Sequence, residues 1–267
     1  MTAPLGLFAG GGQLAGTLLA ALKEQGREVV VVGFKGETPE EVLRGASRSL
    51  SVDTTDLSPV IAFLKEAGVR EAFMAGTVSH LNIYRPPAPE SLTARVLAAL
   101  ADRRADTLLK AAAFQLARAG IRLVSAMPHL KALVPARGAL TRRAPTAEEA
   151  RDVAFGLRIA RGLAGLDVGQ TVVVKDRAVV AVEALEGTDA AIRRAGELCG
   201  PGAVVVKVAK PRQDFRFDVP VVGPGTVASL RAARAAALAV EAGRTLILSR
   251  PEVVALADAA GIALTAV

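Results

Sequence analysis

The sequence is poor in several residue types that define common classes of protein. Its 267 residues include one cysteine, two histidines, one tyrosine and no tryptophan. A lone Cys199 cannot form an intramolecular disulfide, and two histidines cannot build a His-rich cluster, so the usual zinc hydrolase sites are excluded. Because aromatic rings are few, platforms for stacking single-stranded bases are scarce. Nucleic acid is therefore the least favoured anionic partner.

Long apolar runs are missing too. No segment reaches the roughly 18 to 20 uninterrupted apolar residues that a membrane span requires. The first apolar stretch, Leu5 to Ala9, has no basic residue before it and continues into glycines, unlike a signal peptide. We therefore expect a cytoplasmic protein. Its net charge of +7 favours anionic partners such as phosphate esters or an anionic membrane surface.

What the sequence does contain is enough apolar material, 51% of its residues, for one large domain or two smaller ones. Short apolar runs alternate with amphipathic segments in the first half, which predicts a parallel sheet covered by helices on both faces. The predicted strands are 5–9, 28–33, 72–75 and 121–125, and the predicted helices are 13–25, 59–67, 91–100 and 106–119. The fold class is thus α/β, with a Rossmann-like N-terminal domain over 1–134.

The second half predicts a C-terminal α/β domain with a mixed sheet over 146–267. Residues 135–145 hold prolines, a glycine and three arginines and break the periodicity, which indicates a linker. Thr146 followed by Glu149 has the spacing of a capping box. The predicted helices are 147–163, 189–198, 227–242 and a last one near the C-terminus; the predicted strands are 172–174 and 178–182 as a hairpin, 204–208, 245–248 and a final strand.

The first candidate for chemistry is the glycine turn at Gly10, Gly11 and Gly12, between a strand and a helix. Gly11 and Gly12 either contact a phosphate through their backbone N–H groups or simply form a tight turn. An NAD-dependent oxidoreductase would need an acidic residue at the end of the second strand to hold the ribose. No acid follows that strand until Glu37, which weakens this alternative.

Two further candidates follow predicted strands of the second half. Thr188 and Asp189 either cap the helix that they begin, or contact substrate and metal. Glu183 and Glu186 crowd the same turn and increase its acidity. The candidate nearest the C-terminus is a helix start at Thr226 that could bind an anion, although its Gly-Pro-Gly neighbours also suit a simple turn.

A polar run between these positions joins cations with a carboxylate. Its predicted substrate contacts, which would neutralise a diphosphate, are Lys207, Lys210, Arg212 and Gln213. Asp218, ahead of a proline, either binds a metal or activates water. The alternative is a solvated charged loop with no chemical role.

Taken together, these segments resemble the UDP-2,3-diacylglucosamine pyrophosphatases of the LpxI type. The resemblance covers almost the whole chain, and the Asp-Val-Gly-Gln, Glu-Gly-Thr-Asp and Asp-Val-Pro segments make it specific. The matching segments are 5–12, 75–78, 166–170, 182–189, Lys210-Pro211 and 218–220, with Gly223 and Thr226. The chain departs from the family where it has His80 and Ala105-Asp106.

This resemblance implies a magnesium-dependent hydrolase of lipid A biosynthesis that cleaves UDP-2,3-diacylglucosamine to UMP and 2,3-diacylglucosamine 1-phosphate. It also implies a homodimer and an essential aspartate at Asp218, with Asp189 as a second metal contact. An acylated substrate and a basic protein together suggest peripheral contact with the inner membrane. The alternative is a binding protein on the same scaffold that is non-catalytic, or specific for another sugar nucleotide or lipid diphosphate.

Overall fold

The computed structural model describes residues 2–52, 57–77, 91–102 and 105–267, and the chain divides into two compact units. The first unit is Met1–Leu130 together with Asp214–Asp218, and the second is Lys131–Gln213 with Val219–Val267. The chain therefore passes from one unit to the other three times. Val78, His80 and the side chain of Asp106 lie outside the described residues.

The first unit is built on a five-stranded parallel sheet in the order β3-β2-β1-β4-β5. The strands are β1 (Leu5–Ala9), β2 (Val29–Phe34), β3 (Arg48–Val52), β4 (Glu71–Ala75) and β5 (Arg122–Leu123). The strand order reverses between β1 and β4, which is the switch point where open α/β sheets commonly bind ligands. This topology confirms the predicted Rossmann-like domain.

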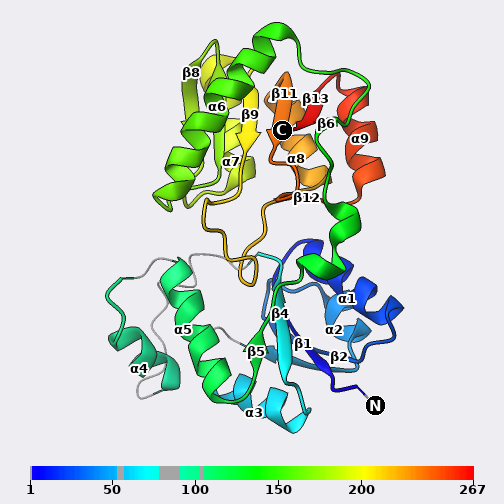
Figure 1. The fold of residues 1–267 in the computed structure, drawn as a ribbon, viewed down its shortest axis with the longest axis vertical. Coiled ribbons are helices and arrows are strands. Elements are labelled where there is room, and N and C mark those ends of the chain that lie inside the picture. The colour runs from blue at the N-terminus through cyan, green and yellow to red at the C-terminus, as the bar shows by residue number, and fades with distance from the viewer. Residues whose placement is uncertain (1, 53–56, 78–90, 103–104) are drawn as a thin grey trace. The chain divides into compact units, whose positions relative to one another are not determined.

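Helices cover both faces of this sheet (Figure 1). They are α1 (Leu14–Glu24), α2 (Glu40–Gly45), α3 (Ser58–Glu66) and α5 (Ala105–Arg118), whereas α4 (Leu92–Ala98) buries none of its residues. Phe8, Val30 and Val32 point to one face, where they form a core with residues of α3 and α5. The prediction lacked α2 and β3. Most of β3 is exposed at the sheet edge, and its polar Arg-Ser-Leu-Ser-Val sequence hides it from a search for apolar runs.

The second unit has a six-stranded mixed sheet in the order β6-β13-β11-β9-β7-β8. The strands are β6 (Gly138–Ala139), β7 (Thr171–Lys175), β8 (Ala178–Val182), β9 (Val204–Lys207), β11 (Ala237–Val240) and β13 (Ala263–Ala266), and β10 (Val221–Val222) pairs separately with β12 (Leu246–Ile247). β7 and β8 form the predicted hairpin. The mixed sheet confirms the predicted fold of this domain.

One face of this sheet is covered by α6 (Ala147–Gly165), and the other by α7 (Thr188–Cys199), α8 (Pro224–Ala232) and α9 (Arg250–Ala259). The predicted helix over 227–242 is correct up to Ala232 and wrong beyond it. α8 ends at Ala232, Arg234 adopts a positive φ of 52°, and the chain continues as the fully buried β11 between β9 and β13. Alanine favours helices in isolation, but the sheet position overrides that preference.

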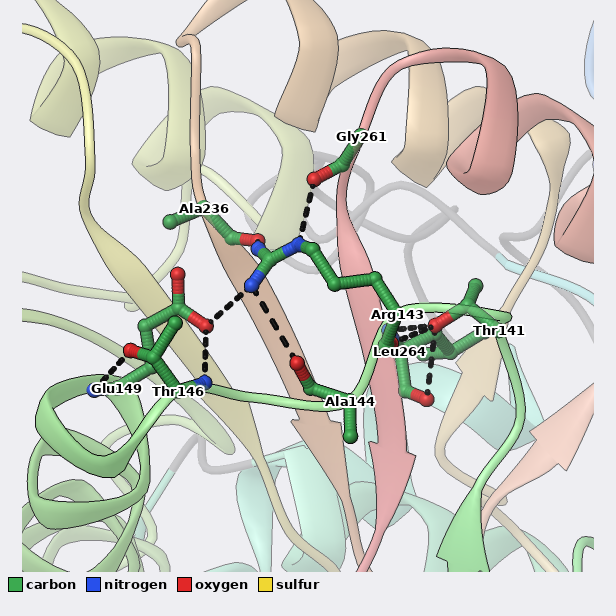
Figure 2. A network of polar contacts seen from close by, with 8 residues as sticks. All are labelled: Thr141, Arg143, Ala144, Thr146, Glu149, Ala236, Gly261 and Leu264. Carbon is green, nitrogen blue, oxygen red and sulfur yellow. Dashed lines mark hydrogen bonds and ion pairs between the residues drawn. The ribbon is translucent and has the colours of Figure 1, made fainter.

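The segment 135–145 belongs to the second unit and is tied to it by a polar network (Figure 2). β6 pairs with β13, and the Arg143 guanidinium donates to the carbonyls of Ala236 and Gly261 and to Glu149. Glu149 also closes the predicted capping box with Thr146. These bonds fix the start of α6 against the sheet.

Four strands of the second unit, β8, β9, β11 and β13, end at one edge of the sheet, and the antiparallel β7 begins there. Carboxyl ends of strands are where α/β sheets place ligands, because loops and helix N-termini converge there. None of the helices in the described part of the chain combines the length and the apolarity that a bilayer crossing demands.

Candidate functional site

The start of α7 brings Thr188 and Asp189 to the carboxyl edge of the second sheet. The N-cap of α7 is Gly187, at a φ of 81°, and no side chain caps the helix. The prediction that Thr188 or Asp189 serves as the cap is therefore wrong, because the helix already begins at Thr188. Both side chains are thereby available for other contacts.

A chain of hydrogen bonds links three side chains at this edge. The Lys207 ammonium at the end of β9 donates to the Thr188 hydroxyl over 2.7 Å, and that hydroxyl donates to Oε1 of Glu183 over 2.7 Å. Lys207 is only 7% exposed, so its charge is buried. The hydroxyl of Thr171, the residue that pairs with Lys207 across the β7–β9 ladder, lies 3.4 Å from that of Thr188.

Asp189 differs from the other acids of this turn. Its Oδ1 is buried and has no hydrogen-bond partner among the residues that the structure describes. Both carboxylate oxygens of Glu183 accept hydrogen bonds, from Thr188 and from the N–H of Gln170. Glu186 is bound by Arg194, and its own backbone N–H together with Arg194 lowers its pKa. An unpaired buried carboxylate oxygen lowers the free energy of unfolding by about 1–3 kcal/mol. Such a cost is typical of a functional group that binds a ligand or an ion.

The N-terminus of α8 lies beside that of α7. A Cβ placed on Gly225 would stand 3.8 Å from Oδ2 of Asp189, and Thr226 in the same turn is buried. Helix N-termini carry partial positive charge and point their N–H groups outward. Two such termini and a buried ammonium therefore make this edge attractive to an anion.

The predicted contacts after β9 have unequal surroundings. Lys210 forms an ion pair with Asp167, and its backbone N–H donates to the Gln213 side chain over 2.9 Å. Arg212 is exposed at the tip between them. The cation of Lys210 is therefore already compensated by a neighbouring carboxylate, whereas that of Arg212 faces solvent.

Glu241 is a residue of this edge that the sequence analysis missed. It follows β11, is 6% exposed, and accepts two bonds from the Arg161 guanidinium at 2.9 and 3.0 Å. Its other oxygen accepts from the N–H of Ala209, which anchors the start of the polar loop. The sequence pattern that could have revealed Glu241 is an acidic residue directly after a run of buried strand residues.

Asp218 lies on the segment that belongs to the first unit. The Phe217 ring packs against the core of that unit, and the N–H groups of Phe217 and Asp218 donate to the carbonyl of Asp214. Arg216 binds the Asp214 carboxylate and lowers the pKa of Asp214. Because Asp189 belongs to the other unit, their joint binding of a metal stays a prediction.

The glycine turn of the first unit is closed by backbone bonds. The N–H of Gly10 donates to Ala75, and that of Gly11 donates to the carbonyl of Thr77 over 2.7 Å. Gly12 adopts a φ of 78°, and among the described residues other than its chain neighbours no atom lies within 4 Å of the position that its Cβ would take. The N–H of Gly11 is therefore occupied within the protein, and no described residue fills the space beside the Gly12 Cα.

These features define an α/β protein in which the second unit offers a buried cation and two helix N-termini to an anionic ligand. Two family models match the chain: the LpxI N-terminal domain over residues 4–133 and the LpxI C-terminal domain over 136–265. The UDP-2,3-diacylglucosamine pyrophosphatase LpxI of Caulobacter vibrioides is 30% identical to it, over 97% of this chain and 95% of the relative. The chain belongs to the LpxI family.

Solved structures show weaker similarity. The biotin carboxylase of Campylobacter jejuni is 15% identical, with a TM-score of 0.29 over 74% of this chain and 42% of that one. The biotin carboxylase subunit of a pyruvate carboxylase is 16% identical, with a TM-score of 0.28 over 74% of this chain and 43% of its own. Scores this low support no conclusion about fold or function.

Proposed function

We propose that this protein is an enzyme of lipid A biosynthesis that hydrolyses the diphosphate of UDP-2,3-diacylglucosamine to UMP and 2,3-diacylglucosamine 1-phosphate. Membership of the LpxI family, with a relative named for this activity that aligns over nearly the full length, carries the proposal. The anion-attracting edge of the second sheet supports it independently.

The second unit would bind the diphosphate. Lys207 is buried, and with respect to the described residues it keeps two of its three ammonium donors for a ligand, since one goes to Thr188. The positive end of the α8 dipole at Thr226 would add to this attraction, although the N–H of Thr226 itself donates to the carbonyl of Gly223. In a site shielded from water, these groups stabilise the negative charge that grows on the phosphate oxygens in the transition state.

Magnesium is the metal that we propose for this site. In the described part of the chain no group of three or more His, Cys, Asp or Glu gathers. Mg²⁺ commonly takes only one or two carboxylates and fills its shell with water and substrate phosphate oxygens. The buried Oδ1 of Asp189, which has no hydrogen-bond partner among the described residues, fits such a minimal set. Asp218 remains the second ligand proposed from the sequence, unless it acts as the base. When bound, the metal would neutralise phosphate oxygens and acidify water.

Hydrolysis requires one water molecule. Its oxygen forms a bond to one phosphorus, the bridging P–O bond breaks, and a base accepts the released proton. We propose that Asp218 is either this base or a metal ligand. Its backbone N–H donates to the carbonyl of Asp214, which holds the turn that carries the Asp218 carboxylate. Gly12, Arg212 and Gln213 remain proposed substrate contacts.

The acylated substrate suggests further properties. We propose a homodimer, and peripheral contact of this basic protein with an anionic membrane face. Sedimentation velocity tests the first. Co-sedimentation with anionic vesicles tests the second, since electrostatic binding weakens as salt rises; no binding at low salt would refute it.

The test of the proposed function is direct. Purified protein with Mg²⁺ and UDP-2,3-diacylglucosamine should release UMP, and EDTA should stop the reaction. Asp218→Asn should reduce the rate at least about 100-fold with an unchanged circular dichroism spectrum, because the side chain keeps its shape and loses its charge. Glu197→Gln, an exposed acid on α7, serves as the control with a normal rate.

A panel of other diphosphates separates the proposal from the alternative. If the wild-type chain releases UMP from none of them but still binds one, it is a binding protein. If Asp218→Asn keeps the wild-type rate, Asp218 has no part in the chemistry. Hydrolysis in ¹⁸O-labelled water shows which product gains the oxygen, and hence which phosphorus is attacked.

A further inference from the structure

Glu183 stands where a metal ligand is expected, next to Thr188 and Asp189 at the carboxyl edge of the sheet. Each of its carboxylate oxygens nevertheless already accepts a hydrogen bond within the protein. Oε1 accepts from the Thr188 hydroxyl over 2.7 Å, and Oε2 from the N–H of Gln170 over 3.3 Å. A side chain on Gly169 would collide with the carbonyl oxygen of Glu183, so only glycine permits this close approach.

The bond to Glu183 sets the orientation of the Thr188 hydroxyl. A hydroxyl has one proton and two lone pairs. Here the proton goes to the carboxylate, so the lone pairs face the ammonium of Lys207 and the hydroxyl of Thr171. Without an acceptor at position 183, the hydroxyl could rotate and the position of the ammonium would no longer be fixed.

Lys207 needs this support because it is buried. A desolvated cation is costly unless it is paired and hydrogen-bonded. Among the described residues its hydrogen-bond partner is Thr188, and the charge that compensates it, on Glu183, is one hydroxyl away. The arrangement leaves two ammonium donors for a ligand and holds them in one direction.

We propose that Glu183 is a positioning residue that acts through Thr188 to aim the Lys207 ammonium at the diphosphate, rather than a ligand of the metal. This inference rests on the proposed function. It assigns the carboxylate a role before the substrate arrives: Glu183 preorganises the cation that later stabilises the transition state.

Steady-state kinetics with UDP-2,3-diacylglucosamine test the proposal. Glu183→Gln keeps an acceptor for Thr188 but loses the charge, and kcat should fall about tenfold; Glu183→Ala loses both, and kcat should fall about 100-fold. KM should stay constant or decrease, since a negative charge near the diphosphate is removed. The Mg²⁺ concentration for half-maximal rate should not change.

Each competing role gives a different result. If Glu183 bound the metal, the Mg²⁺ requirement would rise in both variants. If it were a spectator, kcat would stay within twofold of wild type, as expected for the control Glu197→Gln. Either result overturns the proposal. Thr188→Val, which removes the intervening hydroxyl, should reproduce the kcat loss of Glu183→Ala.

A second measurement does not depend on catalysis. Urea unfolding of Glu183→Gln, Lys207→Met and the double variant forms a double-mutant cycle. We expect non-additive losses of stability, and additive losses would refute the coupling between the two residues. A wild-type chain that releases no UMP refutes the proposed function alone, so the two failures are distinguishable.

Discussion

Replacing Asp189 by Asn should make the metal-free protein more stable while it destroys activity. The carboxylate has a buried oxygen with no partner in the described part of the chain, and such an oxygen costs about 1–3 kcal/mol. Its position in the first turn of α7 returns about 0.3–1 kcal/mol through the helix dipole. Removing the charge loses the favourable interaction with the helix dipole, which is the smaller effect. It also relieves much of the cost of the buried carboxylate oxygen, which is the larger one.

The expected net stabilisation is about 1 kcal/mol, or about 4 °C in the melting temperature of a unit of this size. Since the chain has no tryptophan, far-UV circular dichroism in urea and EDTA is the suitable probe. UMP release should fall at least about 100-fold in the same variant. Gains in stability at the expense of activity are typical of functional residues.

The matched control is Glu252→Gln in the first turn of α9, which loses only the dipole interaction and about 0.3–1 kcal/mol of stability. If Asp189→Asn loses as much stability as this control, the buried oxygen of Asp189 does not destabilise the wild-type protein. If it also hydrolyses the substrate normally, Asp189 is not part of the site.

Two further outcomes are expected. Arg143→Met should lower the free energy of unfolding of the second unit by about 2–3 kcal/mol in urea titrations, because it removes bonds to Glu149, Ala236 and Gly261; a loss below 0.5 kcal/mol would show the network to be dispensable. Burial, and then Arg27, lower the pKa of His129 below 6.5, so the unfolded state binds more protons and stability should decrease as pH falls through 6.5. His129→Gln should reduce this decrease between pH 7.5 and 5.5, and equal slopes would contradict the assignment.

Both sheets could be predicted from the sequence because their central strands are continuous apolar runs. Val29–Phe34 and Val204–Lys207 are buried along nearly their whole length, and such runs need no knowledge of their neighbours. The edge strand Arg48–Val52 was missed for the opposite reason. The strand Ala237–Val240 was mistaken for helix, because only its place between two other strands decides its conformation.

The candidate site was predicted as a set of residue types, but not as a set of contacts. Lys207, Thr188 and Asp189 were each named on their local motifs. Their roles depend on partners distant in sequence: the pairing of Thr171 with Lys207, and the proximity of Gly225 to Asp189. Glu183 could be set apart from Asp189 only once the structure showed that each of its oxygens accepts a hydrogen bond within the protein.

The anchoring of Phe217 has a consequence for how the protein can be divided. Its ring completes the hydrophobic core formed by residues such as Phe8 and Val30, although its codon lies far downstream, within the half of the gene that encodes the second unit. A fragment ending near residue 134 would lack that ring, and the complementary fragment would expose it to water. The two halves are therefore not interchangeable modules: a recombinant exchange of either one between relatives must carry the Asp214–Asp218 segment with the N-terminal partner that it completes.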